Sequence, residues 1–473
     1  MQKEISKNTR RMLEGKHIWL YMLLLSLPIL INNLIKSFNG MVDIYFVARI
    51  HNASSGTIDS AIAALNIHES FNNLILALGV GLSIAAMAII SQFLGAKRED
   101  KARFYAGQFL MIAVIISIVL TVIIISFSGF FVSLMGAKGE TYTFAVEYFN
   151  IRSLELVGVI LFLVYQAIRQ AQGSTILPTV INISGILINI GLTWYFVDIL
   201  NWGVAGSAWA TIIGNLIVVP FIVFDLFFNK KYITISLKSL FPKKDTIKEI
   251  VPFAYPATVS HAVTFFGFLI INSFVLSQFG DVISASFSTG NKLSNLLMNP
   301  IYAITTIGAV FIGTNIGNKQ PERAMKVYKQ SGILTFSLTV FVILIAIAFR
   351  EPFVIALVGD TNPLLIQISK EYTLWLLLTQ PFMAIFQNYM AIFNGSGQSN
   401  LGLKAQSVRL WLFRIPSLLL LWLIFPSMGY SVVWTAMNFS NIVALFYAHH
   451  LKKNIQLDIR VNLNDEQSIE VAV

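Results

Sequence analysis

The chain of 473 residues contains no cysteine, and charged residues make up only 12% of it. Without cysteine there are no disulfides, no iron–sulfur cluster and no zinc site with thiolate ligands. The six histidines are scattered and form no HExxH pair, so we expect no metal catalysis and predict no cofactor. The share of charge is about half that of a soluble globular domain, which excludes a soluble enzyme.

Apolar residues, in contrast, make up 56% of the chain. A membrane-spanning helix uses about 20 mostly apolar residues, so this content is enough for at most about thirteen spans. A disordered chain is excluded because it lacks apolar surface to bury. The composition therefore predicts an all-α membrane protein that crosses the bilayer many times.

Apolar stretches separated by short polar breaks predict twelve transmembrane helices. The first, which begins near Ile18, is followed by no small-residue cleavage site, so we expect a retained span and not a signal peptide. A basic linker at 229–248 separates an N-terminal six-helix lobe, 1–228, from a C-terminal six-helix lobe, 249–451. The remaining residues, 452–473, are predicted to form a polar cytoplasmic tail. The predicted spans are 17–49, 61–94, 103–132, 141–172, 175–200, 204–228, 249–279, 284–315, 323–350, 363–394, 401–426 and 429–451.

The net charge of +10 comes from Lys and Arg residues that concentrate in three segments. These are the break after the second span, the linker and the break after the eighth span, which all fall on the side of the N-terminus. The positive-inside rule therefore predicts that both termini are cytoplasmic. The excess of positive charge needs no nucleic-acid partner to explain it.

The two halves of the chain resemble each other. Residues 92–102 match residues 314–324, and the same offset of 222 pairs Asn73 with Asn295. Because each half has an even number of spans, both insert with the same orientation. The halves are then expected to be related by an axis along the membrane normal, with a cavity between them.

Several motifs carry a more specific resemblance, and they recur in order over nearly the whole chain. Together they resemble the multidrug and toxic compound extrusion (MATE) family of the flippase superfamily; the proline and aspartate of the first span resemble its DinF-like or archaeal branch. The motifs are Pro28, Met41–Asp43, Gly79 and Gly81, Ser91–Gly95, Ile168–Gly173 with Pro178, Asn182–Ser184, Leu187–Asn189, Gly313–Gly317 and Val408–Pro416.

The resemblance implies two pseudo-symmetric six-helix lobes that open alternately to the two sides of the cell membrane. It implies a secondary active antiporter, not an enzyme, that exports amphiphilic or cationic small molecules in exchange for protons or sodium. We expect it to act as a monomer in the plasma or inner membrane.

Asp43 lies inside an apolar helix, where a carboxylate is costly and usually serves a pathway or a partner. We predict that it binds and releases the coupling proton; the alternative is a structural acid near the helix end. Pro28 removes one backbone hydrogen bond from the same helix and can localise a gating bend, or it is an ordinary membrane-helix proline.

By the family's pattern, Tyr148, Asn189 and Thr211 match positions that line the ion and substrate cavity, although such residues also serve helix packing. Thr193 stands where many relatives carry a second aspartate. The acids of the sodium-coupled NorM-like branch are absent from the second half. A cavity poor in carboxylates argues against a strong sodium site, so we predict coupling to protons.

Further ionisable residues fall inside predicted spans. Lys36, two helical turns before Asp43, would repel a sodium ion, or it extends into the aqueous cavity without a role in coupling. Glu69 and Lys292 are candidates for the substrate cavity, or they lie near wet helix ends. Glu69 lies next to His68 in the second predicted span, and Glu155 is a further membrane-embedded candidate in the fourth. Structural roles at cytoplasmic helix ends are expected for Arg169, Arg409 and Arg414.

Four other functions would each need features of their own. A flippase for lipid-linked oligosaccharides or peptidoglycan precursors would need several cavity-facing arginines, and a sodium-coupled exporter would need more carboxylates. A membrane-embedded glycosyltransferase would need acidic or histidine clusters in a membrane-edge loop. A channel would need a pore-loop filter, and the sequence shows none.

Overall fold

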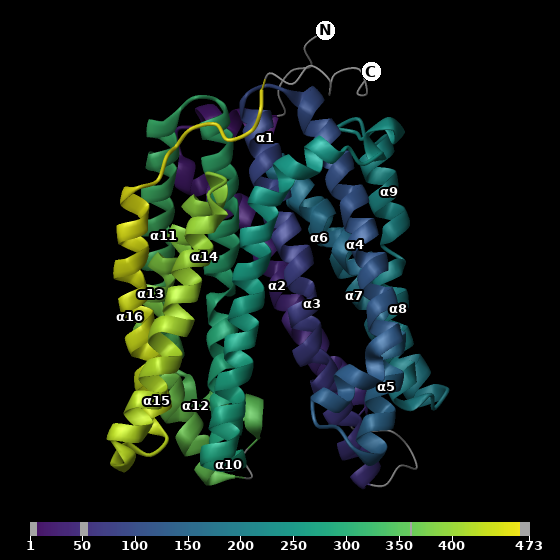
Figure 1. Ribbon diagram of the computed structural model, residues 1–473, viewed down its shortest axis with the longest axis vertical. Coiled ribbons are helices and arrows are strands. Elements are labelled where there is room, and N and C mark those ends of the chain that lie inside the picture. The colour runs from purple at the N-terminus through teal and green to yellow at the C-terminus, as the bar shows by residue number, and fades with distance from the viewer. Residues whose placement is uncertain (1–6, 48–54, 360–361, 464–473) are drawn as a thin grey trace. The chain divides into compact units, whose positions relative to one another are not determined.

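The computed structural model describes residues 7–47, 55–359 and 362–463, and nearly all of them are helical (Figure 1). The chain divides into two compact units. Unit 1 comprises Met1–Thr9, Ile31–Ala254 and Val461–Val473, and unit 2 comprises Arg10–Leu30 and Tyr255–Arg460. Three helices pass from one unit to the other, namely α1 (Lys7–Glu14), α2 (Ile18–Val47) and α10 (Lys244–Gly317).

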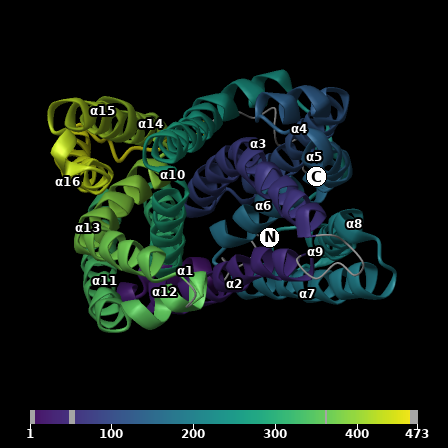
Figure 2. The ribbon, with the colours of Figure 1, turned by 90° about the horizontal axis from the view of Figure 1, so that it is seen from below.

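Unit 1 is built around α3, which packs against α4, α5 and α6, while α7 packs against α8 (Figure 2). Its buried core is apolar and aromatic, with Phe93, Phe109 and Phe149 almost fully enclosed. The helices of this unit are α3 (Ser55–Gly95), α4 (Glu99–Leu134), α5 (Gly139–Ser153), α6 (Leu156–Ala171), α7 (Ile176–Trp194), α8 (Gly203–Leu216) and α9 (Val219–Phe228), with the π-helix η1 (Tyr195–Ile199) after α7 and the 3-10 helix η2 (Leu237–Leu240) after α9.

Unit 2 is built around α13, which packs against α11, α12 and α16. The rings of Tyr372 and Trp434 stack in its core with centroids 4.0 Å apart. Besides the greater part of α1 and of α10, its helices are α11 (Pro321–Ala348), α12 (Arg350–Val358), α13 (Pro363–Gly395), α14 (Ser399–Ser407), the π-helix η3 (Val408–Arg414), α15 (Ile415–Ile424), the 3-10 helix η4 (Pro426–Met428) and α16 (Ser431–Lys453).

The helix α10 is too long to be one span. Its 74 residues correspond to about 110 Å at 1.5 Å per residue, whereas the apolar core of a bilayer is about 30 Å thick. At Gly280 the backbone leaves the helical conformation with φ 78° and ψ −174°, which only glycine adopts readily. The helix therefore consists of two spans that meet at Gly280.

The described residues contain ten helices that are long and apolar enough to cross a membrane. The pair α5 and α6, bent by 48°, makes one further span, and the division of α10 at Gly280 adds the twelfth. Large apolar side chains such as Ile118, Val122 and Phe130 are exposed along α4, as a lipid-facing surface requires. The prediction of an all-α, twelve-helix membrane protein is confirmed.

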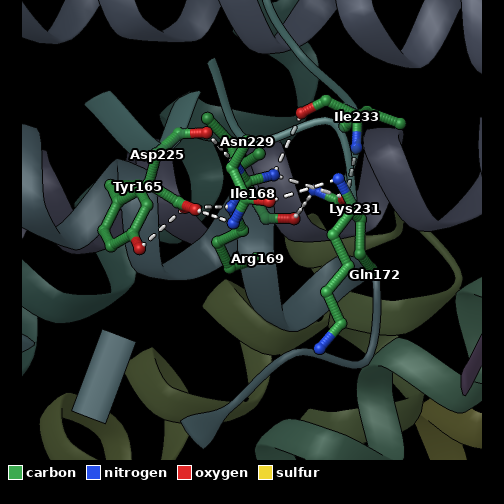
Figure 3. Close-up of polar contacts among 8 residues, drawn as sticks. All are labelled: Tyr165, Ile168, Arg169, Gln172, Asp225, Asn229, Lys231 and Ile233. Carbon is green, nitrogen blue, oxygen red and sulfur yellow. Dashed lines mark hydrogen bonds and ion pairs between the residues drawn. The ribbon is translucent and has the colours of Figure 1, made fainter. Parts of the chain in front are cut away.

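The end of α6 is fixed by an arginine that is completely buried. Arg169 forms an ion pair with Asp225 of α9, and its remaining donors reach backbone carbonyl groups of Asp225 and Ile233 (Figure 3). The hydroxyl of Tyr165 donates to the same carboxylate at 3.0 Å. The sequence assigned Arg169 a structural role at a helix end, and its position in this network supports that role.

The polar segment after α16 makes specific contacts with unit 1. Arg98 donates to the backbone carbonyl of Leu463 at 2.7 Å, and Lys101 donates to that of Asn462 at 2.8 Å. The side chains of Val461 and Leu463 pack on the apolar core of the unit. This part of the segment is docked on the protein, whereas the sequence alone indicated only a polar tail.

Candidate functional site

Unit 1 encloses a polar cavity of about 290 Å³ between α2, α3, α5, α6, α7 and α8. Five of the residues singled out in the sequence line it together: Lys36, Glu69, Tyr148, Asn189 and Thr211. They come from five different helices, so the fold gathers them from positions spread over 176 residues of the chain, 36–211. This cavity is the candidate functional site.

An ion pair lies in the wall of the cavity at the bend between α5 and α6. An Nη2–Oε1 contact of 2.8 Å joins Arg152 to Glu155, and Asn215 donates to the other carboxylate oxygen at 3.0 Å. Glu155 is only 2% exposed and immediately precedes α6, where the positive end of the helix dipole favours a carboxylate. The guanidinium of Arg152 also lies over the ring of Tyr148, 5.6 Å from its centroid.

A second polar group joins α7 to α8. Asn189 donates to the hydroxyl of Thr211 at 3.0 Å, and Thr211 donates in turn to the backbone carbonyl of Ser207. The same amide lies 3.5 Å from the hydroxyl of Thr193, which is completely buried. The carbonyl oxygen of Asn189 is buried and has no hydrogen-bond partner among the described residues, so it can accept a bond from a ligand or a proton carrier.

The close contact of α7 and α8 depends on two glycines. A Cβ atom at Gly214 would lie 2.7 Å from the Cβ of Asn189 and 2.9 Å from the carbonyl oxygen of Gly185. Small residues let membrane helices approach at this distance, so these glycines set the geometry of the Asn189–Thr211 contact.

The histidine expected inside the membrane also faces the cavity. His68 packs edge-on against Tyr148 and Phe149, with ring centroids 5.0 and 5.1 Å apart. It lies next to Glu69, whose side chain is exposed to the cavity. This contact holds Tyr148 between a histidine ring and the guanidinium of Arg152.

The cavity wall is rich in amides and balanced in charge. Two cationic side chains, Lys36 and Arg152, face two anionic ones, Glu69 and Glu155, among the described lining residues. The commonest residue of the wall is asparagine, contributed by Asn39, Asn66, Asn72, Asn73, Asn182, Asn189 and Asn215. Each amide offers both donors and acceptors, so the wall can bind a polar ligand of either charge.

The other predicted residues have different positions. The backbone of Asp43 lies in α2, but its side chain is outside the described residues, as are the contacts on which its role depends. Pro28 lies within α2, in the part that belongs to unit 2, three residues before the chain enters unit 1 at Ile31. Lys292 is exposed on α10 in unit 2 and is not among the residues that line the cavity.

Sequence reasoning missed Arg152 and the link from Asn215 to Glu155. The signal was present in part, because Arg152 and Glu155 are three residues apart inside an apolar segment and can meet on one helix face. Asn215 is 60 residues from Glu155, and only the packing of α8 brings the two together.

A polar cavity inside a bundle of twelve transmembrane helices is typical of membrane proteins that handle small solutes. The family model MatE matches residues 28–195 and 256–420, so the chain belongs to the MATE family, which comprises transporters and not enzymes.

The chain is also similar to proteins named multidrug export protein MepA. It is 25% identical over 284 residues to the protein from Staphylococcus aureus strain MRSA252 and 27% identical over 282 residues to the one from Staphylococcus haemolyticus strain JCSC1435. In both comparisons the match covers 59% of this chain and 60% of the relative. The chain thus matches about three fifths of the length of these relatives.

Solved structures show the same fold. An outward-facing multidrug resistance MATE family transporter of the MOP superfamily superposes with a TM-score of 0.86 and 20% identity over 96% of this chain and 100% of that one. A MOP superfamily transporter from Pyrococcus furiosus, described as having a binding pocket of reverse polarity, gives a TM-score of 0.85 and 21% identity over 95% and 98% of the two chains. The two-lobe fold of this family is therefore confirmed for the chain.

Proposed function

We propose that the protein is a secondary active antiporter that exports amphiphilic or cationic small molecules in exchange for protons by alternating access. The observation that carries the proposal is the polar cavity of unit 1, in which Lys36, Glu69, Tyr148, Asn189 and Thr211 converge within a MATE-family chain. The name of the MepA relatives, multidrug export protein, supports export as the activity. We further propose a monomer in the cell membrane with both termini cytoplasmic.

The cavity chemistry supports a broad range of small substrates. The Arg152–Glu155 pair presents both signs of charge at one point, and the surrounding asparagines supply neutral donors and acceptors. An organic cation can bind near Glu69 or compete with Arg152 for Glu155, while the apolar parts of the wall, such as Leu76 and Phe162, contact its hydrocarbon surface. A polar wall with apolar patches is suited to amphiphiles.

Coupling to protons follows from the distribution of charge around the cavity. Asp43 is the proposed proton carrier, on the same helix as Lys36, which lines the cavity. A positive charge two helical turns from the carrier opposes binding of any cation, but a proton forms a covalent O–H bond with the carboxylate, whereas sodium is held by electrostatic attraction alone and needs several oxygen ligands. The buried Asn189, Thr193 and Thr211 group adds hydrogen-bond acceptors but no carboxylate. The placement in the DinF-like or archaeal branch of the family remains our proposal.

Sodium coupling is the nearest alternative, and a flippase for lipid-linked oligosaccharides or peptidoglycan precursors is the second. The flippase requires several unpaired cations for phosphate groups. In the described wall of the cavity the cations are Lys36 and Arg152, and Glu155 already neutralises Arg152. The exporter is therefore the better fit.

The test uses purified protein in proteoliposomes loaded with a fluorescent cationic dye. Export is measured under a pH gradient without a sodium gradient, and under a sodium gradient at equal pH on both sides; protein-free liposomes are the control. We expect movement of dye only under the pH gradient. Sodium-driven movement at equal pH contradicts proton coupling, and the absence of movement under both gradients, for dyes to which expressing cells show resistance, contradicts export.

A further inference from the structure

Unit 2 contains two arginines that are buried among its helices, Arg409 and Arg414. They are 5% and 2% exposed, although the sequence suggested helix ends next to lipid headgroups. Arg414 donates to the hydroxyl of Ser440 at 2.8 Å and to the amide oxygen of Asn441 at 2.6 Å. Arg409 contacts the sulfur of Met383 at 3.2 Å, and its Nε atom has no partner among the described residues.

Neither arginine forms an ion pair with a carboxylate in the described part of the chain. Unit 1 offers a direct comparison, because its two enclosed arginines, Arg152 and Arg169, lie 2.8 and 2.6 Å from Glu155 and Asp225. The same residue type is therefore neutralised in unit 1 and left uncompensated in unit 2.

The backbone of this segment places both arginines on the same side of one helix. Arg409 and Arg414 lie in the π-helix η3, in which backbone hydrogen bonds join residues five apart. Two residues at that spacing stack one above the other in a π-helix, whereas they diverge around the axis of an α-helix.

The surrounding groups do not supply the missing negative charge. The guanidinium of Arg409 lies over Phe386 and that of Arg414 over Phe268, at 5.1 and 5.5 Å from the ring centroids. A ring face recovers only a small part of the cost of removing a cation from water. Beyond Asn441, the hydrogen-bond chain continues through Thr379 and Asn438, which are both neutral.

We propose that Arg409 and Arg414 form an anion-binding site in unit 2 that takes the oxyanion of a carboxylate or phosphate group. The guanidinium group presents parallel N–H donors that match such an oxyanion, and the buried Nε atom of Arg409 is an unused donor at the site. The site is separate from the cavity of unit 1 and does not depend on the export function proposed for it. The anion comes either from a free solute or from a lipid headgroup.

The test is a thermal-unfolding titration of the purified full-length protein in a neutral detergent, at constant ionic strength. Inorganic phosphate and acetate are the free-solute probes, and nanodiscs of phosphatidylglycerol against phosphatidylcholine test the headgroup. We expect a saturable rise in Tm for the wild type and for the matched control Lys404→Gln, which removes an exposed charge from α14, close to η3. Arg409→Lys keeps the positive charge but loses the parallel N–H donors of the guanidinium group. For this variant we expect the anion concentration at half-saturation to be at least tenfold higher.

A second variant separates an anion site from a merely structural arginine. Because Arg409→Met removes an uncompensated buried charge, we expect its Tm in anion-poor buffer to exceed that of the wild type and not to respond to added anion. A lower Tm for Arg409→Met in anion-poor buffer, or an equal anion response in wild type and variant, overturns the proposal. So does a wild type that responds to neither solute nor anionic lipid. A response to phosphatidylglycerol alone, lost in the variants, supports the site and assigns the oxyanion to a headgroup.

Discussion

The guanidinium group of Arg169 binds both the side chain and the backbone of Asp225. Its Nε atom lies 2.6 Å from Oδ2 of Asp225, and its Nη2 atom donates to the backbone carbonyl oxygen of Asp225 at 2.8 Å. The contact joins α6 to α9 in a region that excludes water. Two segments of the chain 56 residues apart are thereby fixed by one ion pair.

Breaking this pair from one side is expected to destabilise unit 1 strongly. Asp225→Asn leaves a buried guanidinium without its counter-charge, at a cost of about 3–5 kcal/mol in the free energy of unfolding. Thermal unfolding in detergent measures the loss. The control is Glu14→Gln, which removes the exposed partner of Arg10 and is worth about 0–1 kcal/mol. Equal Tm values for the two variants contradict the role of Arg169.

The Glu155–Arg152 pair is expected to control the charge of the accepted substrate. Glu155→Gln removes the negative charge that neutralises Arg152 in the cavity wall. We therefore expect the affinity for cationic dyes to fall at least tenfold and the affinity for anionic dyes to rise. Dye-binding titrations and export assays measure both changes. Glu147→Gln, an exposed change on the same helix α5 that leaves the cavity lining intact, serves as the control. An unchanged preference between cationic and anionic dyes in Glu155→Gln contradicts a role of this pair in selecting the charge of the substrate.

The spacing of α7 and α8 is expected to tolerate no methyl group at Gly214. In Gly214→Ala the new Cβ meets the Cβ of Asn189 at 2.7 Å, so α7 must shift and the Asn189–Thr211 hydrogen bond lengthens. We expect a loss of about 1–3 kcal/mol, as for other overpacked sites, and weaker export. Gly191→Ala on α7 is the matched control, since its Cβ meets no atom within 4 Å. A Gly214→Ala protein as stable and active as Gly191→Ala contradicts the contact.

The coupling role of Asp43 predicts a specific loss. Asp43→Asn should fold and bind dye but should lose export driven by a pH gradient, because an amide cannot carry the proton. Lys36→Gln should keep pH-driven export and change its pH dependence, since a positive charge two turns away is removed. Proteoliposome transport at several pH values measures both. Normal pH-driven export by Asp43→Asn disproves the role of Asp43; an unchanged pH profile in Lys36→Gln shows that Lys36 has no tuning role.

The distribution of basic residues predicts the sidedness of the protein. Tags placed before Met1 and after Val473 should both be shielded from an impermeant label in intact cells and become reactive after permeabilisation. A tag in the predicted exterior break at 133–140 serves as the positive control. Labelling of either terminus in intact cells shows that the predicted orientation is wrong.

The sequence predicted the fold class because each helix that spans a bilayer needs about 20 consecutive, mostly apolar residues, which can be recognised locally. It also singled out Lys36, Tyr148 and Thr211, which the structure places around one cavity, although their roles remain predictions. The hydrogen bond of Asn215 to Glu155 and the ion pair of Arg169 with Asp225 could not be predicted, because contacts between helices depend on packing and not on spacing. The buried state of Arg409 was misread for the same reason, since a helix end in the sequence does not reveal what covers it.

The division of the chain between the two units has a consequence for biosynthesis. Residues 10–30 leave the ribosome early but belong to unit 2, whereas the segment that begins at Val461 follows the last residues of unit 2 and belongs to unit 1. Domains usually fold one after another as they emerge. Unit 2 has all of its parts once Arg460 has been made. Arg98 and Lys101 of unit 1 find their backbone acceptors at Leu463 and Asn462 only after that point. The first unit is therefore completed after the second, and a protein truncated at residue 460 would lack these two backbone acceptors for Arg98 and Lys101.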